Sequence, residues 1–160
     1  MKRPDYFDWD ETFMHVCRVI AQRSKDPNTQ TGACIVNDKN IIIGLGYNGF
    51  PRGCSDDQLP WDRDGDFCAT KYPYVVHAEE NAILNVNSSP QEARLYCILF
   101  PCNECTKVII QSGIKEVIYE DDKYHDLDIW KASRKMLDLA GISCRQYIPK
   151  NKLTFEKKDE

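Results

Sequence analysis

Long apolar runs are missing from this sequence. No stretch of 18 consecutive apolar residues occurs, which argues against a transmembrane helix. The first residues, MKRPDYFDWDETF, contain no apolar core of the kind found in a secretory signal peptide. Both absences favour a cytoplasmic protein with no membrane partner. Internal repeats and flexible linkers are absent as well, so we expect residues 1–160 to form a single domain.

Basic residues are too few to give the chain a positive charge. Lys and Arg number 21 against 25 Asp and Glu, and the formal net charge is −4. A broad basic face for duplex DNA or folded RNA is therefore not expected, and we predict no nucleic-acid partner. A small anionic ligand is still compatible with this composition, because a few local cations can hold one phosphate. Hydrophobic residues make up 42% of the chain, which is enough for a sizeable core.

Eight cysteines are present, but a reducing cytoplasm disfavours disulfides. Four of them lie inside apolar segments, where we expect small buried side chains: Cys17, Cys34, Cys97 and Cys144. Two more, Cys54 and Cys68, lie in a long loop that contains no histidine. A structural zinc site needs about four ligands, and His15 and Cys17 could complete one only if the fold brought them close. We therefore expect Cys54 and Cys68 to be free thiols.

Hydrophobic periodicity predicts a chain of alternating helices and strands. The expected helices cover residues 8–24, 77–87, 101–113 and 127–141, and the expected strands are a hairpin within 31–48 followed by 93–100, 115–120 and 143–148. Asp8 or Asp10 can cap the first helix, and Gly113 and Gly141 end two later ones. An apolar stripe on the first helix contains Trp9, Phe13, Val16, Cys17 and Ile20.

The order of these elements predicts an α/β fold. Strands and helices alternate in the second half, which implies parallel strands there, and the hairpin adds an antiparallel pair at one edge. Residues 48–73 form a long segment rich in Gly, Pro and Asp, without a helical or strand period. A loop of this length in a compact domain is usually functional or disordered, and its Trp61, Phe67, Tyr72 and two cysteines argue against disorder. Residues 150–160 are expected to be a loosely held tail.

The most informative motif places His77 and Glu79 one strand ahead of a Cys-x-x-Cys sequence. Cys102 and Cys105 are i, i+3 partners at the start of a predicted helix, where the helix dipole and free N–H groups favour thiolates. His77 also opens a helix. One His and two Cys supply three ligands of tetrahedral zinc and leave the fourth position to water, as catalytic zinc sites do. Glu79 can then carry protons without binding the metal.

This order of residues, H-x-E followed by P-C-x-x-C, is the signature of zinc deaminases of nucleobases. Two other classes stay open. One is a redox protein in which Cys102 and Cys105 form a reversible disulfide. The other is a non-catalytic zinc module that binds nucleotides to regulate a partner. Glu79 argues against that module, because a structural zinc site has no need of a proton carrier.

The likeness to known deaminases extends beyond the zinc motif. Over about residues 10–148, five segments resemble the cytidine/deoxycytidylate deaminase family: AQRSKDPNTQTGACIV, GYNGFPRGCSDD, KYPYVVHAEENAI, FPCNECTKVIIQSGIKEVIY and DKYHD. The resemblance implies a three-layer αβα sandwich around a five-stranded mixed sheet. It also implies a homohexamer and allosteric control by deoxynucleoside triphosphates.

Hydrolytic deamination of dCMP to dUMP and ammonia is the activity that the resemblance implies, a reaction that supplies dUMP for dTMP synthesis. Family members usually respond to dCTP as activator and to dTTP as inhibitor, and such a triphosphate would arrive with Mg²⁺. Another cytosine nucleoside or nucleotide stays open as the substrate, because the sequence does not display how the sugar 2′ position is sensed. A tRNA adenosine substrate is disfavoured, because the chain lacks basic stripes.

Candidate residues for substrate and effector lie on both sides of the zinc motif. A cationic, hydrogen-bonding set for a phosphate follows the first helix: Arg23, Ser24, Lys25 and Asn28. The resemblance adds Tyr124 as a phosphate contact, Asn48 as a contact to the sugar or base edge, and the backbone of Ala78 as a donor to the pyrimidine carbonyl. Glycines let backbone N–H groups approach phosphates, and the candidate effector residues are Gly44, Gly46, Tyr47, Gly49 and Gly53. Each set also has an interpretation without a ligand. The residues after the first helix could be a solvated helix end, and the glycines could simply permit turns.

Overall fold

Five strands form one sheet in the computed structural model, which describes residues 1–158. The strands are β1 (Gly32–Val36), β2 (Ile42–Tyr47), β3 (Arg94–Leu99), β4 (Glu116–Asp121) and β5 (Ser143–Gln146). The helices are α1 (Trp9–Ala21), α2 (Ala78–Leu84), α3 (Asn103–Gln111) and α4 (Asp128–Leu139), with a short 3-10 helix η1 (Phe67–Ala69). No helix within the described residues is both long and apolar enough to cross a membrane.

The sheet is mixed, with the strand order β2-β1-β3-β4-β5. Strand β1 runs antiparallel to β2 and to β3, whereas β3, β4 and β5 run parallel to one another. Helices α3 and α4 connect these parallel strands, because parallel neighbours need a crossover that returns the chain to the same end of the sheet. The predicted parallel strands and the predicted hairpin at one edge are thus confirmed.

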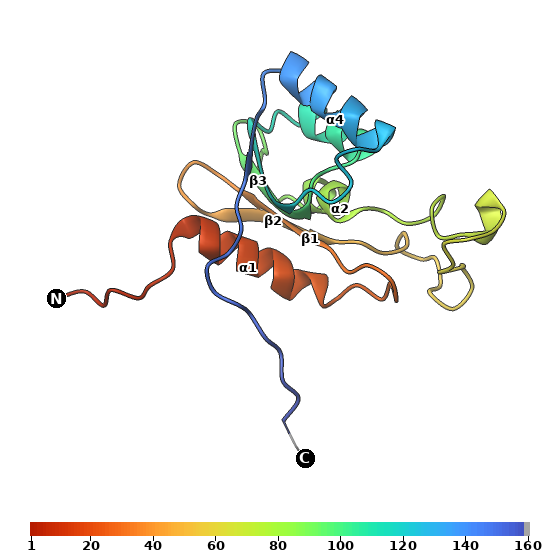
Figure 1. Ribbon diagram of the computed structural model, residues 1–160, viewed down its shortest axis with the longest axis horizontal. Helices are drawn as coiled ribbons and strands as arrows, with labels where there is room; N and C mark the ends of the chain where they lie inside the picture. The colour runs from red at the N-terminus through yellow and green to blue at the C-terminus, as the bar shows by residue number, and fades with distance from the viewer. Residues whose placement is uncertain (159–160) are drawn as a thin grey trace.

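Alternation along the strands sends side chains to opposite faces of the sheet. On one face, Cys34 and Tyr96 pack with Phe13 of α1. On the other face, Ile35 and Leu95 belong to a larger core that includes residues of α2, α3 and α4. Helix α1 therefore covers one face and the other three helices cover the second (Figure 1). The predicted α/β fold, a three-layer αβα sandwich with a five-stranded mixed sheet, is confirmed.

The start of α1 shows how the two candidate caps divide their roles. Asp8 is the cap, because its carboxylate accepts a backbone N–H of the first turn at 2.8 Å. Asp10 instead accepts two hydrogen bonds from the guanidinium of Arg145 in β5, at 2.7 and 2.8 Å. On the predicted apolar stripe, Trp9 is 56% exposed and stacks on Phe13, with ring centroids 5.4 Å apart. Phe13 is therefore the first ring of α1 that lies inside the core.

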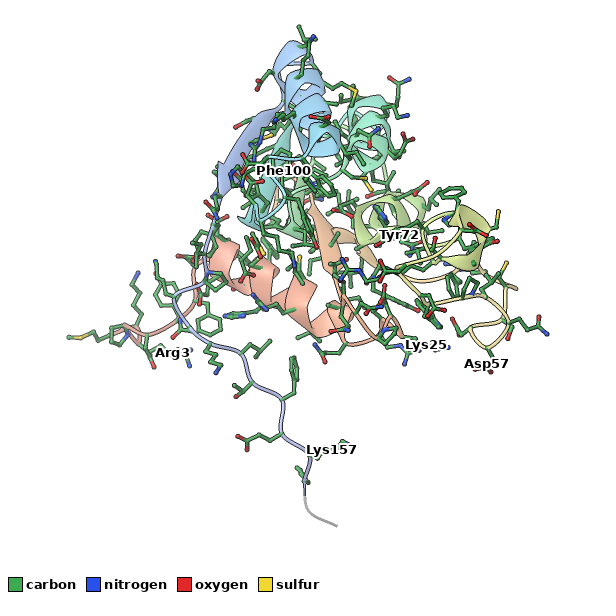
Figure 2. All side chains as sticks on the ribbon, turned by 45° about the vertical axis from the view of Figure 1, so that its right-hand side comes forward. Arg3, Lys25, Asp57, Tyr72, Phe100 and Lys157 are labelled. Carbon is green, nitrogen blue, oxygen red and sulfur yellow. The ribbon has the colours of Figure 1, made fainter. Side chains whose placement is uncertain are left out.

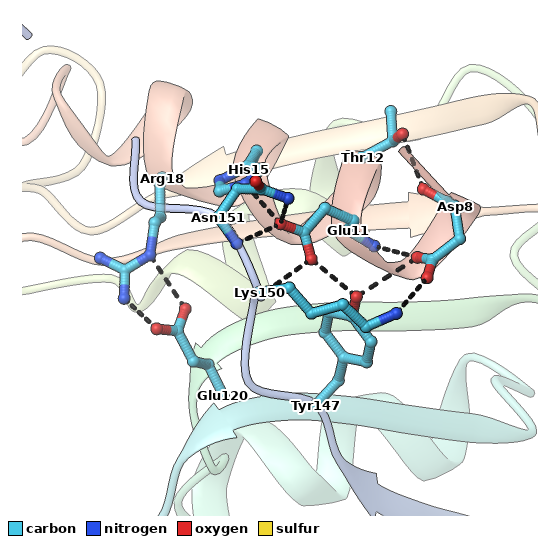
Figure 3. Close-up of polar contacts among 9 residues, drawn as sticks. All are labelled: Asp8, Glu11, Thr12, His15, Arg18, Glu120, Tyr147, Lys150 and Asn151. Atoms are coloured by element: carbon cyan, nitrogen blue, oxygen red, sulfur yellow. Dashed lines mark hydrogen bonds and ion pairs between the residues drawn. The ribbon is translucent and has the colours of Figure 1, made fainter. Parts of the chain in front are cut away.

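The C-terminal segment crosses back over α1 and is tied to it by one buried carboxylate (Figure 3). The Glu11 carboxylate accepts the backbone N–H groups of Lys150 and Asn151, at 2.9 and 2.8 Å, and the hydroxyl of Tyr147 at 2.7 Å. Burial opposes its charge, but these donors outweigh burial and lower the pKa of Glu11 to about 2. The first two residues of the predicted loose tail, Lys150 and Asn151, are therefore held against α1, and its last two, 159–160, lie outside the described residues.

Cysteine burial follows the sheet. Cys17, Cys34 and Cys97 are buried, as predicted, but Cys144 is exposed. Cys144 lies in β5, which has a neighbouring strand on only one side. An edge strand is covered less completely than a central one, so the apolar surroundings of Cys144 in the sequence do not produce burial. The prediction of a buried Cys144 is therefore wrong.

Candidate active site

Two helix N-termini bring the predicted metal ligands together. His77 is the residue that caps α2 and Cys102 the residue that caps α3, and both have extended backbone there. The Nδ1 atom of His77 lies 3.4 Å from the sulfur of Cys102 and 3.4 Å from that of Cys105. The three ligand atoms lie within 4.8 Å of one another, and no other such group of three occurs among residues 1–158. The sequence motif thus corresponds to one compact donor triangle.

The donor triangle fits a zinc ion in its chemistry. Two sulfurs and one imidazole nitrogen are the ligands that Zn²⁺ prefers, and three protein ligands leave one position for water or substrate. A hydrogen bond from Cys105 lowers the pKa of the Cys102 thiol to about 4, and a hydrogen bond with Cys102 raises the pKa of His77 to about 9. The lowered pKa favours the thiolate form of Cys102, which is the form that binds a metal. Both cysteines are buried whereas His77 is exposed, so the triangle faces solvent on its imidazole side.

Glu79 lies beside this triangle without belonging to it. Glu79 is 7% exposed, and its Oε2 atom lies 3.8 Å from the sulfur of Cys105. Burial raises the pKa of the Glu79 carboxyl above its ordinary value. A carboxyl group that gains and loses its proton closer to neutral pH is suited to carrying protons in a reaction. The geometry therefore suits the predicted division between three ligands and one proton carrier.

Asn48 lies at the end of β2 in a buried polar cluster. Asn48 is 6% exposed. Its Oδ1 atom accepts a hydrogen bond from the backbone N–H of Thr31 at 2.9 Å, and its Nδ2 atom donates one to the carbonyl of Thr29 at 2.8 Å. Asp26 lies beside it, 2% exposed, and forms an ion pair with Lys71, which is 7% exposed. Sequence reasoning missed Asp26 and Lys71. The Asn48 amide also donates to the Asp26 carboxylate at 3.5 Å, so Asp26 adds to the two backbone bonds that orient the Asn48 carboxamide.

A pocket of about 220 Å³ lies between the turn after α1 and the start of the long loop. Its lining combines residues that the sequence assigned to two different ligands, namely Arg23, Lys25, Tyr47, Gly49 and Gly53. Arg52 adds a cation that sequence reasoning missed, and Lys25 forms an ion pair with Asp56. Figure 2 shows Lys25 and Asp57 at the end of the molecule that the loop forms. The pocket lining contains neither the zinc ligands nor Glu79.

The remaining residues predicted for phosphate binding are held by neighbouring groups. The hydroxyl of Ser24 accepts the backbone N–H of Asp26 at 3.3 Å, and the side-chain amide of Asn28 donates to the carbonyl of Trp61 at 3.3 Å. Neither lines the pocket. Both therefore lie in the turn after α1, where their contacts shape the backbone between the pocket and Asn48.

Gly44 and Gly46 have a packing explanation. A Cβ atom on Gly44 would lie 2.6 Å from the carbonyl oxygen of Ala82, and one on Gly46 would lie 2.2 Å from that of Ala78. Strand β2 and helix α2 therefore approach each other too closely for a side chain at either position. Neither glycine lines the pocket. Ala78, the first residue of α2, is buried at this contact.

Tyr124 follows β4 and lies against α4. Its ring contacts that of Trp130, with centroids 4.8 Å apart, and the Nζ atom of Lys123 lies 5.0 Å from its centre. Trp130 and Ser133 are further residues that sequence reasoning missed, and both donate to carbonyls just before Cys102. The sequence did offer a signal for them. A tryptophan and a serine one turn apart on the inner face of a predicted helix carry an indole N–H and a hydroxyl, and such polar groups need hydrogen-bond partners when they are buried.

The loop cysteines lie apart from any group of metal ligands within the described residues. Cys54 and Cys68 are exposed and form no disulfide. The cluster of His77, Cys102 and Cys105 is the one place where three metal-binding side chains converge in that part of the chain.

Comparisons with known proteins agree with the site. Residues 7–121 match the family model described as the cytidine and deoxycytidylate deaminase zinc-binding region. The deoxycytidylate deaminase of Pongo abelii is 60% identical, and that of Homo sapiens 58% identical, over 93% of this chain and 85% of each relative. A solved structure of the dCMP deaminase from the cyanophage S-TIM5, in complex with dCMP and dUMP, has a TM-score of 0.70 at 25% identity, over 92% of this chain and 100% of that chain.

A zinc-dependent hydrolase that removes an amino group is the class of enzyme that this fold and this site define. The chain belongs to the cytidine and deoxycytidylate deaminase family. The family predicted from the motif and the surrounding segments is thus confirmed.

Proposed function

We propose that this enzyme hydrolyses dCMP to dUMP and ammonia, and so supplies dUMP for dTMP synthesis. The observation that carries the proposal is the donor triangle of His77, Cys102 and Cys105 with the buried Glu79 carboxyl beside it. The names of the relatives, and the dCMP and dUMP bound to the phage enzyme, support the choice of substrate.

Each part of the site has a step in this reaction. Zn²⁺ held by the triangle would make a water molecule acidic enough to serve as the nucleophile. Glu79, whose Oε2 atom lies 3.8 Å from the Cys105 sulfur, would accept the proton that the nucleophile loses and return it to the amino group at C4 of the pyrimidine, which leaves as ammonia. The N–H of Ala78 is among the first of α2, which have no acceptor within the helix, and we propose that it donates to the pyrimidine carbonyl.

The sugar and phosphate contacts complete the proposal. We propose that Asn48 contacts the sugar or base edge by exchanging its two long contacts, with the Thr31 hydroxyl and the Asp26 carboxylate, both at 3.5 Å. Tyr124 remains our candidate for the substrate phosphate. The predicted set after α1, namely Arg23, Ser24, Lys25 and Asn28, is the alternative holder of that phosphate, but its two cations Arg23 and Lys25 line the pocket at the loop end, for which we favour an effector.

The pocket at the loop end offers a second anion site. We propose that it binds the triphosphate of dCTP, an activator, or dTTP, an inhibitor, with Mg²⁺, and that loop 48–73 is regulatory. Three cations in its lining, Arg23, Lys25 and Arg52, outnumber its one carboxylate, Asp56, which pairs with Lys25, and this balance favours an anion. Gly49 and Gly53 give the backbone close access to phosphates. We also propose a homohexamer in the cytoplasm, supported by exposed apolar side chains on or near α4, such as Leu127 and Leu139.

The first experiment follows the absorbance change on deamination of dCMP, CMP and deoxycytidine, each with and without dCTP and dTTP. We expect dCMP to be converted best, with dCTP raising the rate and dTTP lowering it. Equal conversion of deoxycytidine would remove the phosphate role from the candidate residues. A protein that binds zinc but converts none of the three would instead be a regulatory zinc module.

Arg23→Gln distinguishes the two assignments of the cationic pocket. If the pocket holds the effector, the variant loses the response to dCTP while the KM for dCMP without effectors stays within about twofold. A KM for dCMP that rises in the absence of any effector would assign Arg23 to the substrate phosphate.

A further inference from the structure

We propose that Trp130 of α4 is a positioning residue that couples the candidate phosphate contact, Tyr124, to the metal-binding turn. Its indole N–H donates to the carbonyl of Phe100 at 3.0 Å, two residues before the ligand Cys102. Its ring contacts the ring of Tyr124, with centroids 4.8 Å apart and planes tilted by 35°. One rigid side chain therefore touches both segments while lying outside the donor triangle.

Ser133 reinforces the first of these contacts from the next turn of α4. Its hydroxyl donates to the carbonyl of Pro101 at 2.8 Å and lies 2.6 Å from the hydroxyl of Thr106 in α3. Ser133 and Thr106 are both fully buried. Two consecutive carbonyls directly ahead of Cys102 are thus bound by side chains of α4. Because a buried carbonyl without a partner is costly, these bonds hold the backbone that aims the Cys102 sulfur.

Arg134 reinforces the contact with the Tyr124 segment. Its guanidinium forms an ion pair with Asp122 and lies 4.0 Å from the centre of the Phe100 ring. Two side chains of α4, Trp130 and Arg134, therefore each contact both the segment after β4 and the residue that follows β3. Lys123 places its charge 5.0 Å from the centre of the Tyr124 ring, so a phosphate at Tyr124 would also meet a cation.

This arrangement couples the position of the Tyr124 ring to that of the turn before Cys102. A shift of the Tyr124 ring moves the indole, and the indole N–H carries that shift to the carbonyl of Phe100 and so to the turn that holds Cys102. Side chains that orient metal ligands from outside typically change metal affinity by about 10–100-fold when they are removed. Trp130 therefore influences two quantities: the affinity of the site for zinc and the preference of the enzyme for a substrate that carries a phosphate. The second effect rests on the function proposed above for Tyr124.

Two substitutions separate the two contacts of Trp130. Trp130→Phe keeps a ring against Tyr124 but removes the N–H, so we expect zinc to be lost about tenfold faster to a chelator while the preference for dCMP over deoxycytidine is retained. Trp130→Leu removes both contacts, so we expect the same zinc loss and, in addition, a KM for dCMP raised about tenfold with little change for deoxycytidine. Lys131→Ala, at an exposed neighbouring position, is the control and should change neither quantity.

Ser133→Ala supplies an independent variant should a smaller residue at position 130 unfold the chain. It removes the hydrogen bond to Pro101 and should also accelerate zinc loss, without affecting the preference for dCMP. Unchanged zinc retention in all three variants, or lowered thermal stability with unchanged zinc retention and substrate preference, would overturn the inference. Equal use of dCMP and deoxycytidine by the unmodified enzyme would instead refute the phosphate proposal, and zinc retention would still test Trp130.

Discussion

At the scale of single residues, Glu79 combines burial with a position beside the metal ligands. We expect Glu79→Gln to lower kcat by about 10²–10⁴-fold, the usual contribution of a positioned acid–base group, because an amide cannot carry the proton. Zinc content should not change, since Glu79 is not one of the three ligands. The measurement is turnover of dCMP together with zinc content by atomic absorption.

Glu80→Gln is the matched control, because it makes the same chemical change one residue along α2. It should retain most of the activity. A Glu79→Gln enzyme that turns over dCMP at the normal rate would rule out the proposed proton carrier.

The buried ion pair of Asp26 and Lys71 supports a prediction about stability. We expect Lys71→Met to lower the free energy of unfolding by about 3–5 kcal/mol, because it leaves the buried Asp26 carboxylate without its counter-charge. Adding Asp26→Asn should recover part of this loss. Lys25→Met is the control, because its ion pair with Asp56 is largely exposed and should be worth at most about 1 kcal/mol. Urea unfolding of these three variants and the unmodified protein checks this, and equal losses for Lys71→Met and Lys25→Met would contradict it.

These residues also show what the sequence could predict at this scale. The convergence of His77, Cys102 and Cys105, with Glu79 beside them, could be predicted because fixed spacings place these residues at two helix starts. The pair of Asp26 and Lys71 could not, because the partners are 45 residues apart and each looks like an ordinary surface charge. Only the fold shows that both are buried.

At the scale of elements, strand β2 and helix α2 pack without room for side chains between them. We expect Gly46→Ala to lower the free energy of unfolding by about 3 kcal/mol, the upper part of the range for overpacking, because the new methyl would meet backbone atoms of Ala78 and Ala82. Helix α2 carries Glu79 and begins at His77, so displacing it should also reduce zinc content.

Gly49→Ala is the control, because its added methyl would find its nearest neighbour 3.7 Å away, an ordinary contact. Thermal unfolding and zinc analysis of both variants provide the measurement. A Gly46→Ala protein as stable and as zinc-rich as the Gly49→Ala protein would show that the contact between β2 and α2 yields easily.

The helices and strands follow the predicted order, but hydrophobic periodicity does not predict where each of them ends. The prediction extended the second helix to residue 87, but α2 ends at Leu84. The side-chain amide of Asn85 donates to the carbonyl of Leu45, and the N–H of Asn87 donates to that of Ile43. These bonds to β2 replace the continuing helix. A tertiary contact of this kind cannot be read from the helical pattern.

At the scale of the whole molecule, Glu11 joins the two ends of the chain that the structure describes. The sequence predicted a loosely held tail over residues 150–160, as chain termini commonly are. The tie was not predictable, because two of the donors to Glu11 are backbone N–H groups, which every residue except proline carries. No residue type marks such a partner, and the contact spans nearly the full length of the described chain.

This tie gives the molecule a distinct acid sensitivity. The pKa of Glu11 falls from an ordinary 4.5 to about 2 in the folded chain. A lowered carboxyl pKa contributes stability that is complete above the unfolded value and is lost as the pH falls toward the folded one. We therefore expect the contribution of Glu11 to the free energy of unfolding to disappear between pH 4.5 and about 2.

Glu11→Gln should be less stable than the unmodified enzyme at pH 7, by about 1.5–3 kcal/mol, because hydrogen bonds to a charged group are lost. It should also lose less stability on acidification, because an amide does not titrate. Asn151→Ala removes one side-chain donor and keeps the backbone donors, so its pH dependence should be intermediate. Denaturant unfolding at several pH values between 7 and 2 measures all three. Parallel pH profiles for the unmodified enzyme and Glu11→Gln would mean that the carboxylate is not what ties the C-terminal segment to α1.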